Sequence, residues 1–524
     1  MAIKKYFATL DNTITNAYKV DMNTRGTGSN MGASDILEVF SIYGQQDSAS
    51  SELSRLLIQF PIDQIQTDRS ASTIPASGNV DFYLRLFNAK HSQTLPKSYN
   101  MIIARIEKSW NEGTGLDMEN YSDIDQSNWI RANSSTDWTT EGGDYTHAPG
   151  YSFTASFDAG TEDIEVNISA LVERWANDTS NTLDAVPNYG VGVFLAPTEE
   201  AADRSYYTKK FFGRGTEFFF KKPCIEARWN SSETDDRANF YYSSSLAPAD
   251  DNVNTLYLYN YVRGRLRNIP GLEKVGGKIY LSLFSGSSNN LSASAYHPIQ
   301  LAKGGGVVTA LDFNATGGII STGIYTASVC VTASSTPLTK LFDVWHDSAA
   351  EAGGLGAPYG HGAVQYKSGT IEPKTFESYN INPSDQYVSN ITNLKSSYSR
   401  DETARFRLYI RPKDWSPNIY SKANVEPETT IIESASYSIY RIVDDLTIVP
   451  HGTGTTGAPA RGSVNTLHTL MSYDVSGNYF DFDMGLLEAG YSYAISTAYY
   501  NGAIGSWQDQ PETFKFKVES RQKE

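Results

Sequence analysis

Strand-like runs separated by polar turns recur along the whole chain. Residues 404–411, 437–442 and 491–495 each alternate apolar or aromatic residues with polar ones. Because successive side chains of a strand point to opposite faces of a sheet, this alternation predicts antiparallel strands with one buried face. Similar runs nearer the N-terminus are separated by Gly- and Ser-rich loops such as residues 24–30. This punctuation is typical of a β-sandwich.

One segment predicts a helix instead. In residues 167–175 the apolar positions are spaced three and four residues apart, which gives a helix one apolar face, and Asn167 suits the N-terminal cap. The residues on that face are Ile168, Leu171, Val172 and Trp175.

The length of the chain, 524 residues, is too great for one hydrophobic core, so we expect three domains. The expected boundaries are residues 1–232, 237–375 and 376–524, with the polar stretch 230–236 as a linker. We expect each domain to be a β-sandwich, and the second and third to be Ig-like.

The second domain is expected to contain strands at residues 255–259, 278–283 and 323–331. Gly-rich turns at residues 304–306 and 317–318 are expected to separate them.

Composition supports an all-β fold and limits the partners. Aromatic residues make up 12% of the chain, with 34 Tyr, whereas only 19% of residues are charged, and this balance favours strand over helix. The net charge of −16 argues against a nucleic-acid partner, because neutralising phosphates requires clustered Lys and Arg. Cys224 and Cys330 fall in different expected domains, so we expect two buried thiols and no disulfide framework.

The N-terminal residues 1–6 have a basic start but lack the apolar run of a signal peptide, and no segment is apolar enough to span a bilayer. Either processing has removed a signal, or the protein is assembled in the cytoplasm. The second explanation fits a chain that still carries Met1.

Five segments that we expect to be strands resemble, in this order, the DNRLRE family, a β-sandwich module of bacterial cell-surface proteins and phage virions. The segments are residues 7–14, 54–60, 80–86, 110–115 and 188–193. The resemblance covers residues 1–232, with residues 218–229 as the closing strand, and implies a jelly-roll-like fold. It also implies display and binding rather than catalysis.

A second resemblance covers the C-terminal part of the chain. Residues 413–417, 472–481 and 510–516 are similar to segments of structural proteins from marine contractile-tailed, myovirus-like phages. This resemblance implies a virion location, other virion proteins as partners, and a homo-oligomer, because virion components occur in symmetric copies. We expect the third domain to anchor the protein and the first to be exposed.

Trp110, Trp129 and Trp138 form a candidate carbohydrate-binding group, because a sugar can stack on an aromatic plane while polar neighbours bind its hydroxyls. The polar neighbours are Asn111, Glu112, Asp125 and Asn128. The alternative interpretation, which we favour, is that the tryptophans pack in a core, since the segment that begins at Trp110 recurs in DNRLRE modules whatever their ligand.

Asp117, Glu119, Asp123 and Asp125 supply the oxygen ligands that Ca²⁺ prefers. Their spacing does not match an EF-hand loop, so a solvated acidic loop is the favoured interpretation and calcium the alternative. No other cofactor is indicated.

Catalytic patterns are sparse. His346 and His361 are 15 residues apart, with Asp347 beside the first, and a zinc site or a dyad there would need a further ligand or a nucleophile. Glu141 and Asp144 could form a pair of hydrolase carboxylates, but nothing in the spacing of these two residues selects them for that role. Together with the two resemblances, which imply a virion location, this sparseness predicts a non-enzymatic structural protein of a tailed-phage virion, at its head, neck or tail.

Two alternatives remain open. A host-surface polysaccharide-binding adhesin would need the three tryptophans exposed in one patch. A polysaccharide-degrading enzyme would need two carboxylates roughly 5–9.5 Å apart in a cleft.

Overall fold

The computed structural model describes most of the chain, and strands dominate the described part, which confirms the all-β prediction. None of the described helices has the length or the apolar character needed to cross a membrane. The described residues are 2–46, 50–91, 96–117, 123, 125–176, 186–245, 247–272, 277–285, 299–302, 313–332, 338–347, 365–374, 387–416, 429–454, 460–463, 465–502 and 504–520, with the side chains of 206–208 excepted.

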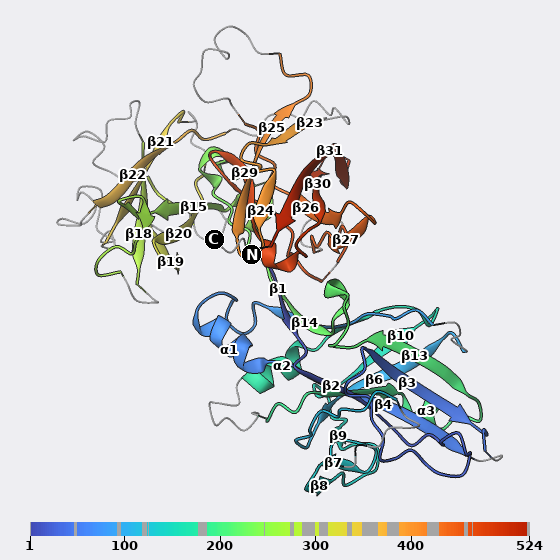
Figure 1. The fold of residues 1–524 in the computed structure, drawn as a ribbon. Helices are drawn as coiled ribbons and strands as arrows, with labels where there is room; N and C mark the ends of the chain where they lie inside the picture. Colours follow the sequence, from blue (N-terminus) through green and yellow to red (C-terminus); the bar gives the residue numbers. More distant parts are fainter. Residues whose placement is uncertain are drawn as a thin grey trace.

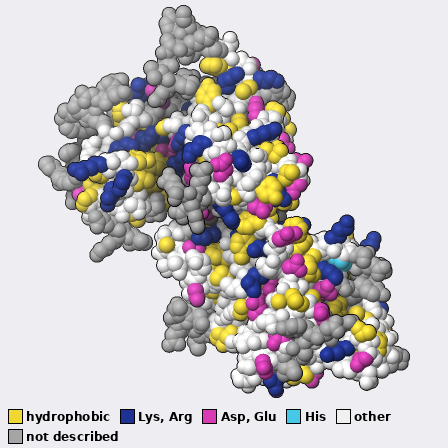
Figure 2. Space-filling model, in the orientation of Figure 1, with side chains coloured by type: hydrophobic (Ala, Val, Ile, Leu, Met, Phe, Trp, Pro, Cys, Tyr) yellow, Lys and Arg dark blue, Asp and Glu magenta, His cyan; other side chains and the backbone are white. Residues whose placement is uncertain are grey.

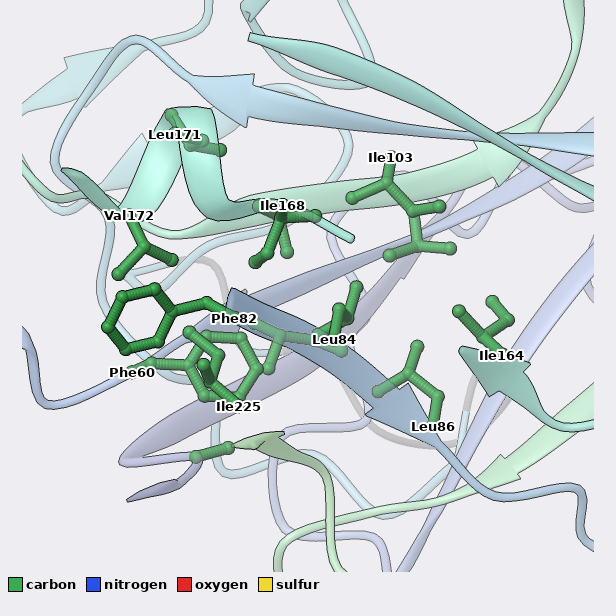
Figure 3. Packing of buried hydrophobic residues seen from close by; sticks show 14 of the residues in the cluster. Phe60, Phe82, Leu84, Leu86, Ile103, Ile164, Ile168, Leu171, Val172 and Ile225 are labelled. Atoms are coloured by element: carbon green, nitrogen blue, oxygen red, sulfur yellow. The ribbon is translucent and has the colours of Figure 1, made fainter. Parts of the chain in front are cut away.

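The first unit is a sandwich of two antiparallel sheets. The smaller sheet contains, in spatial order, β1 (Ile3–Phe7), β14 (Cys224–Arg228), β5 (Asp81–Leu86) and β11 (Ile164–Asn167). The larger sheet contains, in spatial order, β10 (Ser152–Phe157), β6 (Tyr99–Ile106), β12 (Val191–Leu195), β4 (Ser51–Gln59), β3 (Ile36–Tyr43) and β13 (Tyr206–Phe212), with β2 (Leu10–Thr15) beside β4 and β9 (Tyr145–Thr146) beside β6. Figure 3 shows their inner faces meeting, with Leu84 of β5 near Ile103 of β6.

Two helices pack at one end of this unit (Figure 1). The predicted helix is present as α2 (Ser169–Ala176), with its apolar face buried and the Asn167 side chain accepting a 2.9 Å bond from the Ser169 amide. A second helix, α1 (Ile62–Ser70), has no counterpart in the predictions, because only Ile62 and Ile65 of its nine residues are apolar. A short helix, α3 (Pro197–Glu200), follows β12.

One segment expected to be a strand, residues 110–115, is irregular. A Cβ on Gly113 would lie 1.9 Å from the side-chain oxygen of Asn30. Only glycine at position 113 therefore allows this segment to pack against the loop that contains Asn30. The Gly115 amide donates to the same oxygen at 3.0 Å and is therefore not available to a strand partner.

Six of the described strands of the second unit form one antiparallel sheet, and β16 (Tyr261–Val262) and β17 (Arg265–Leu266) form a separate hairpin, so two facing Ig-like sheets stay a prediction there. The spatial order is β15 (Asn254–Tyr259), β20 (Ile324–Val329), β19 (Ala315–Ser321), β18 (Ile279–Ser285), β21 (Leu341–His346) and β22 (Gln365–Ile371). The prediction of a turn at residues 317–318 is wrong. Gly317 lies inside β19, where a Cβ would meet the Thr326 carbonyl oxygen at 2.4 Å, and the turn expected at 304–306 lies outside the described residues.

The third unit is a sandwich of two sheets. One contains β23 (Tyr387–Ile391), β25 (Thr403–Pro412), β29 (Gly477–Asp483) and β28 (Ser472–Asp474). The other contains β24 (Ser397–Ser399), β31 (Ser506–Glu519), β30 (Ser492–Asn501), β26 (Ala435–Arg441) and β27 (Leu446–Val449), with β24 parallel to β31. The rings of Tyr437 and Phe480 stack between the two sheets, 3.9 Å apart. The predicted strands at 404–411, 437–442 and 491–495 correspond to β25, β26 and β30.

Candidate functional site

The three tryptophans proposed for carbohydrate binding are buried, at 4% exposure for Trp110, 4% for Trp129 and 6% for Trp138. They form a second core with Ile14 and Leu57 on the outer face of the larger sheet, under the loop that carries β7 (Arg131–Asn133) and β8 (Thr136–Asp137). A buried indole cannot stack on a sugar, so the platform interpretation is wrong and the core interpretation holds.

The polar groups near these tryptophans serve the fold. The Trp110 indole N–H donates to the Tyr189 carbonyl at 2.8 Å, and the Trp138 indole N–H donates to the Asn128 carbonyl at 2.9 Å. Glu112 pairs with Arg214 at 2.7 Å. These partners are internal and leave none of these groups oriented toward a ligand.

The proposed calcium loop does not assemble a site in the part of the chain that the structure describes. Asp123 accepts hydrogen bonds from the Thr114 amide at 2.7 Å and the Thr114 hydroxyl at 3.0 Å, and thus closes a loop, whereas Asp117 and Asp125 are exposed. Glu119 lies outside the described residues. Among those residues, no group of three His, Cys, Asp or Glu side chains is placed to hold a metal ion.

His346 of β21 contacts Ser282 of β18. The Ser282 hydroxyl lies 3.0 Å from His346 Nε2, which is the separation of a nucleophile and its base. Both side chains have 0% exposure, so no substrate reaches them, and the contact is a buried structural hydrogen bond. His361 lies outside the described residues.

Asp144 also has an internal role. Its carboxylate accepts from the Thr139 and Thr140 amides at 2.9 Å and pairs with Lys108 at 2.8 Å, whereas Glu141 is exposed. Burial opposes ionisation, but the bonds from Lys108 and the amides hold the pKa of Asp144 below its usual value. A glycosidase acid needs a raised pKa, so Asp144 is unsuited to that role.

The most elaborate arrangement of polar side chains lies where the first unit meets the third. Figure 1 shows β1 and β14 running up to the third unit. Ile3 of β1 belongs to the hydrophobic core of the third unit, and Phe220 packs against that core. The guanidinium of Arg400 lies over the Phe219 ring at 4.5 Å, and that of Arg441 lies over the Phe220 ring at 5.2 Å.

The expected linker is an ordered connector that pairs with β28. Thr234 forms a parallel β-bridge with Tyr473. The Asp235 amide donates to the Tyr473 carbonyl at 3.1 Å, and the Tyr473 amide donates to the Glu233 carbonyl at 3.0 Å. The chain therefore leaves the first unit along the third unit before it enters the second.

A cavity of ≈ 310 Å³ lies in this junction, between the outer face of the smaller sheet and residues around β27. The cavity is lined by the buried pair Glu226 and Arg228. Glu226 also contacts Lys5 at 3.2 Å, and Arg228 contacts the exposed Glu165 at 2.6 Å. Burial opposes ionisation of Glu226, but Lys5, Arg228 and Arg85 hold its pKa far below the usual range.

Two histidines of the third unit lie near this junction, and of these His468 is buried and His451 is half-buried. Burial lowers the pKa of His468, which lines the cavity, to about 4, and the positive charge of Arg228 adds to the effect. Burial lowers the pKa of His451 to about 4 as well. Both imidazoles are therefore neutral at pH 7.

Sequence reasoning missed this junction. In β14, Glu226 and Arg228 alternate with the buried residues Ile225 and Ala227, a pattern that indicates a strand with one solvated face. In the structure the third unit covers this charged face. The one signal in the sequence was that neighbouring strands carry many charged residues of opposite sign.

Comparisons with known proteins do not assign the chain to a family. No protein-family model matches the sequence. No curated protein matches it either. Among solved structures, a DUF4785 family protein from Legionella pneumophila is 7% identical over 98% of this chain and 92% of that chain, with a TM-score of 0.13, which is too low to support an inference.

Proposed function

We propose that the protein is a non-enzymatic structural component of a tailed-phage particle that acts through protein-protein contacts. The observation that carries the proposal is the fixed junction of the first and third units, with Ile3 in the core of the third unit and the connector paired to β28. Domains of one chain move relative to each other unless their interface is large and hydrophobic. An assembly protein must hold its contact surfaces at a constant geometry, and such a junction provides it.

The internal use of the candidate catalytic groups supports the same proposal. Ser282, His346 and Asp144 each satisfy a partner within the fold. The resemblances of the first and third units to display modules and phage structural proteins add to it. The third unit is the proposed anchor.

Mass spectrometry and immunogold labelling of purified particles test this function. We expect the protein in intact particles and the label at one site, on either separated heads or separated tails. Absence from particles, together with free protein or protein on cell surfaces, would contradict the proposal. Labelling of whole particles that is lost from washed ones would also contradict it, because a structural component is not removed by washing.

A further inference from the structure

A small β-hairpin projects from the second unit. It consists of β16 (Tyr261–Val262) and β17 (Arg265–Leu266), joined by Arg263 and Gly264. Both turn residues have positive φ, 54° and 75°, which defines a tight mirror-image turn. This turn favours Asn or Gly at its first position, so an arginine there is strained and its charge is held at the tip of the hairpin.

The hairpin exposes both apolar and basic side chains. Tyr261 is 61% exposed and Val262 is 50% exposed. Arg263, Arg265 and Arg267 are exposed as well, and among the described residues none forms an ion pair or hydrogen bond with their guanidinium groups. We call these five residues the basic hairpin. Figure 2 shows Lys and Arg side chains gathered over the second unit on the face drawn.

The base of the hairpin is fixed to the sheet. The Asn260 amide donates to the Gly323 carbonyl at 2.8 Å, and the Gly323 amide donates to the Asn268 side chain at 2.7 Å. These bonds anchor the hairpin at the turn between β19 and β20. The basic hairpin is therefore presented in a fixed direction.

The opposite charge lies at the other end of the same strand. Asp250 and Asp251 are exposed in a single helical turn, η4 (Asp250–Asn252), just before β15 begins, and no described residue pairs with their carboxylates. The basic hairpin follows directly after β15 ends. Six residues of strand separate the two charged groups by roughly 20 Å.

We propose that the basic hairpin of one copy of this chain binds the Asp250–Asp251 turn of a second copy. Tyr and Arg are enriched at the centres of protein interfaces, and opposite charges at the two ends of β15 suit a head-to-tail contact. Two basic hairpins facing each other would repel, so each hairpin meets the acidic turn of the other copy. Repeated in one direction, this contact builds a ring or a stack, and formed twice about a two-fold axis it closes a dimer. This inference rests on the proposed assembly function and names the surface that serves it.

Neutralising each end separately tests the contact by analytical ultracentrifugation of the full chain. We expect the wild type to form oligomers that dissociate as salt is raised, because exposed ion pairs are screened. The variants R263S/R265S/R267S and D250N/D251N are each expected to be monomeric, with self-association weakened at least tenfold. An equimolar mixture of the two is expected to form heterodimers and nothing larger, since one complementary pair of ends remains.

A matched control removes three exposed positive charges elsewhere, at Lys90, Lys97 and Lys515, and is expected to associate like the wild type. A wild type that is monomeric in all conditions, or variants that associate unchanged, would overturn the proposal. Binding to an acidic polysaccharide that needs the arginines but not the aspartates, without self-association, would also overturn it. Particle labelling is independent of these results, so failure of this contact is distinguishable from failure of the structural function.

Discussion

The phenolic hydroxyl of Tyr473 donates a 2.6 Å hydrogen bond to the Asp236 carboxylate, although 237 positions separate the two residues. This bond joins the connector to the third unit beside the backbone pairing of Thr234 with Tyr473. Burial raises the pKa of both groups, Tyr473 and Asp236, so each depends on a partner inside the protein.

Replacing Tyr473 with Phe is expected to lower the free energy of unfolding by about 1–2 kcal/mol, because the buried Asp236 carboxylate loses this donor and keeps the Thr255 amide, at 2.6 Å, among the described residues. Urea titration followed by tryptophan fluorescence measures the change. An unchanged unfolding midpoint would show that this hydrogen bond contributes nothing to the junction.

Replacing Glu226 with Gln is expected to cost about 3 kcal/mol, because Arg228, whose side chain is 4% exposed, loses one of its two carboxylates. The control is D481N, which breaks the Arg405–Asp481 pair at 2.7 Å, where both side chains are at least one-third exposed. Breaking that pair is expected to cost less than about 1 kcal/mol. Equal losses in the two variants would contradict the assigned role of the buried Glu226–Arg228 pair.

Lys209 is buried at 1% exposure, and its ammonium group donates to Asn88 Oδ1 at 2.7 Å and to the Glu162 carbonyl at 2.8 Å. Burial lowers the pKa of Lys209 to about 8. K209M is expected to destabilise the first unit by about 3 kcal/mol, because these acceptors lose their donor. Its neighbour Lys210 pairs with Glu38 near the surface, so K210M is expected to cost at most about 1 kcal/mol in the same thermal melts. A reversed order would be inconsistent with the described packing.

The pH dependence of stability is expected to depend on His468. Because its pKa is about 4 in the folded chain against an ordinary 6.5, the unfolded chain binds the proton first as the pH falls. The neutral His468 therefore contributes stability that is fully present above pH 6.5 and is lost as the pH falls toward 4. Between pH 7 and pH 5 we expect this contribution to the free energy of unfolding to fall by about 2 kcal/mol.

Other buried groups act in the opposite direction. Burial raises the pKa of Asp11 and of Asp235 to about 6, so protonation of these carboxyls favours the folded chain as the pH falls below 6. The whole-chain profile is thus partly compensated, and the comparison must be made against H468N. Urea unfolding at pH 7, 6 and 5 is expected to show the wild type losing more stability than H468N, and parallel profiles would refute the assignment.

The alternation of side chains predicted many strands correctly because it depends only on which face of a strand is buried. Helix α2 was predictable from its apolar stripe, whereas α1 was not, since tertiary contacts of Ile62 and Ile65 hold an otherwise polar segment. Tryptophans with polar neighbours have the same local pattern in an exposed platform and in a second core. The junction was not predictable, because its contacts join residues more than 200 positions apart, such as Glu233 with Ser472.

The proposed structural role depends on a fixed geometry at the junction of the first and third units, and a distance distribution measures that geometry most directly. Cysteines introduced at the exposed residues Ser156 and Lys515 accept spin labels. The native Cys224 and Cys330 are buried, and burial raises the pKa of Cys224 to about 12 and also raises that of Cys330, so both stay unlabelled. Pulsed electron spin resonance is expected to give one narrow distance distribution. A broad distance distribution, or one with several peaks, would contradict a fixed junction and therefore the proposed structural role.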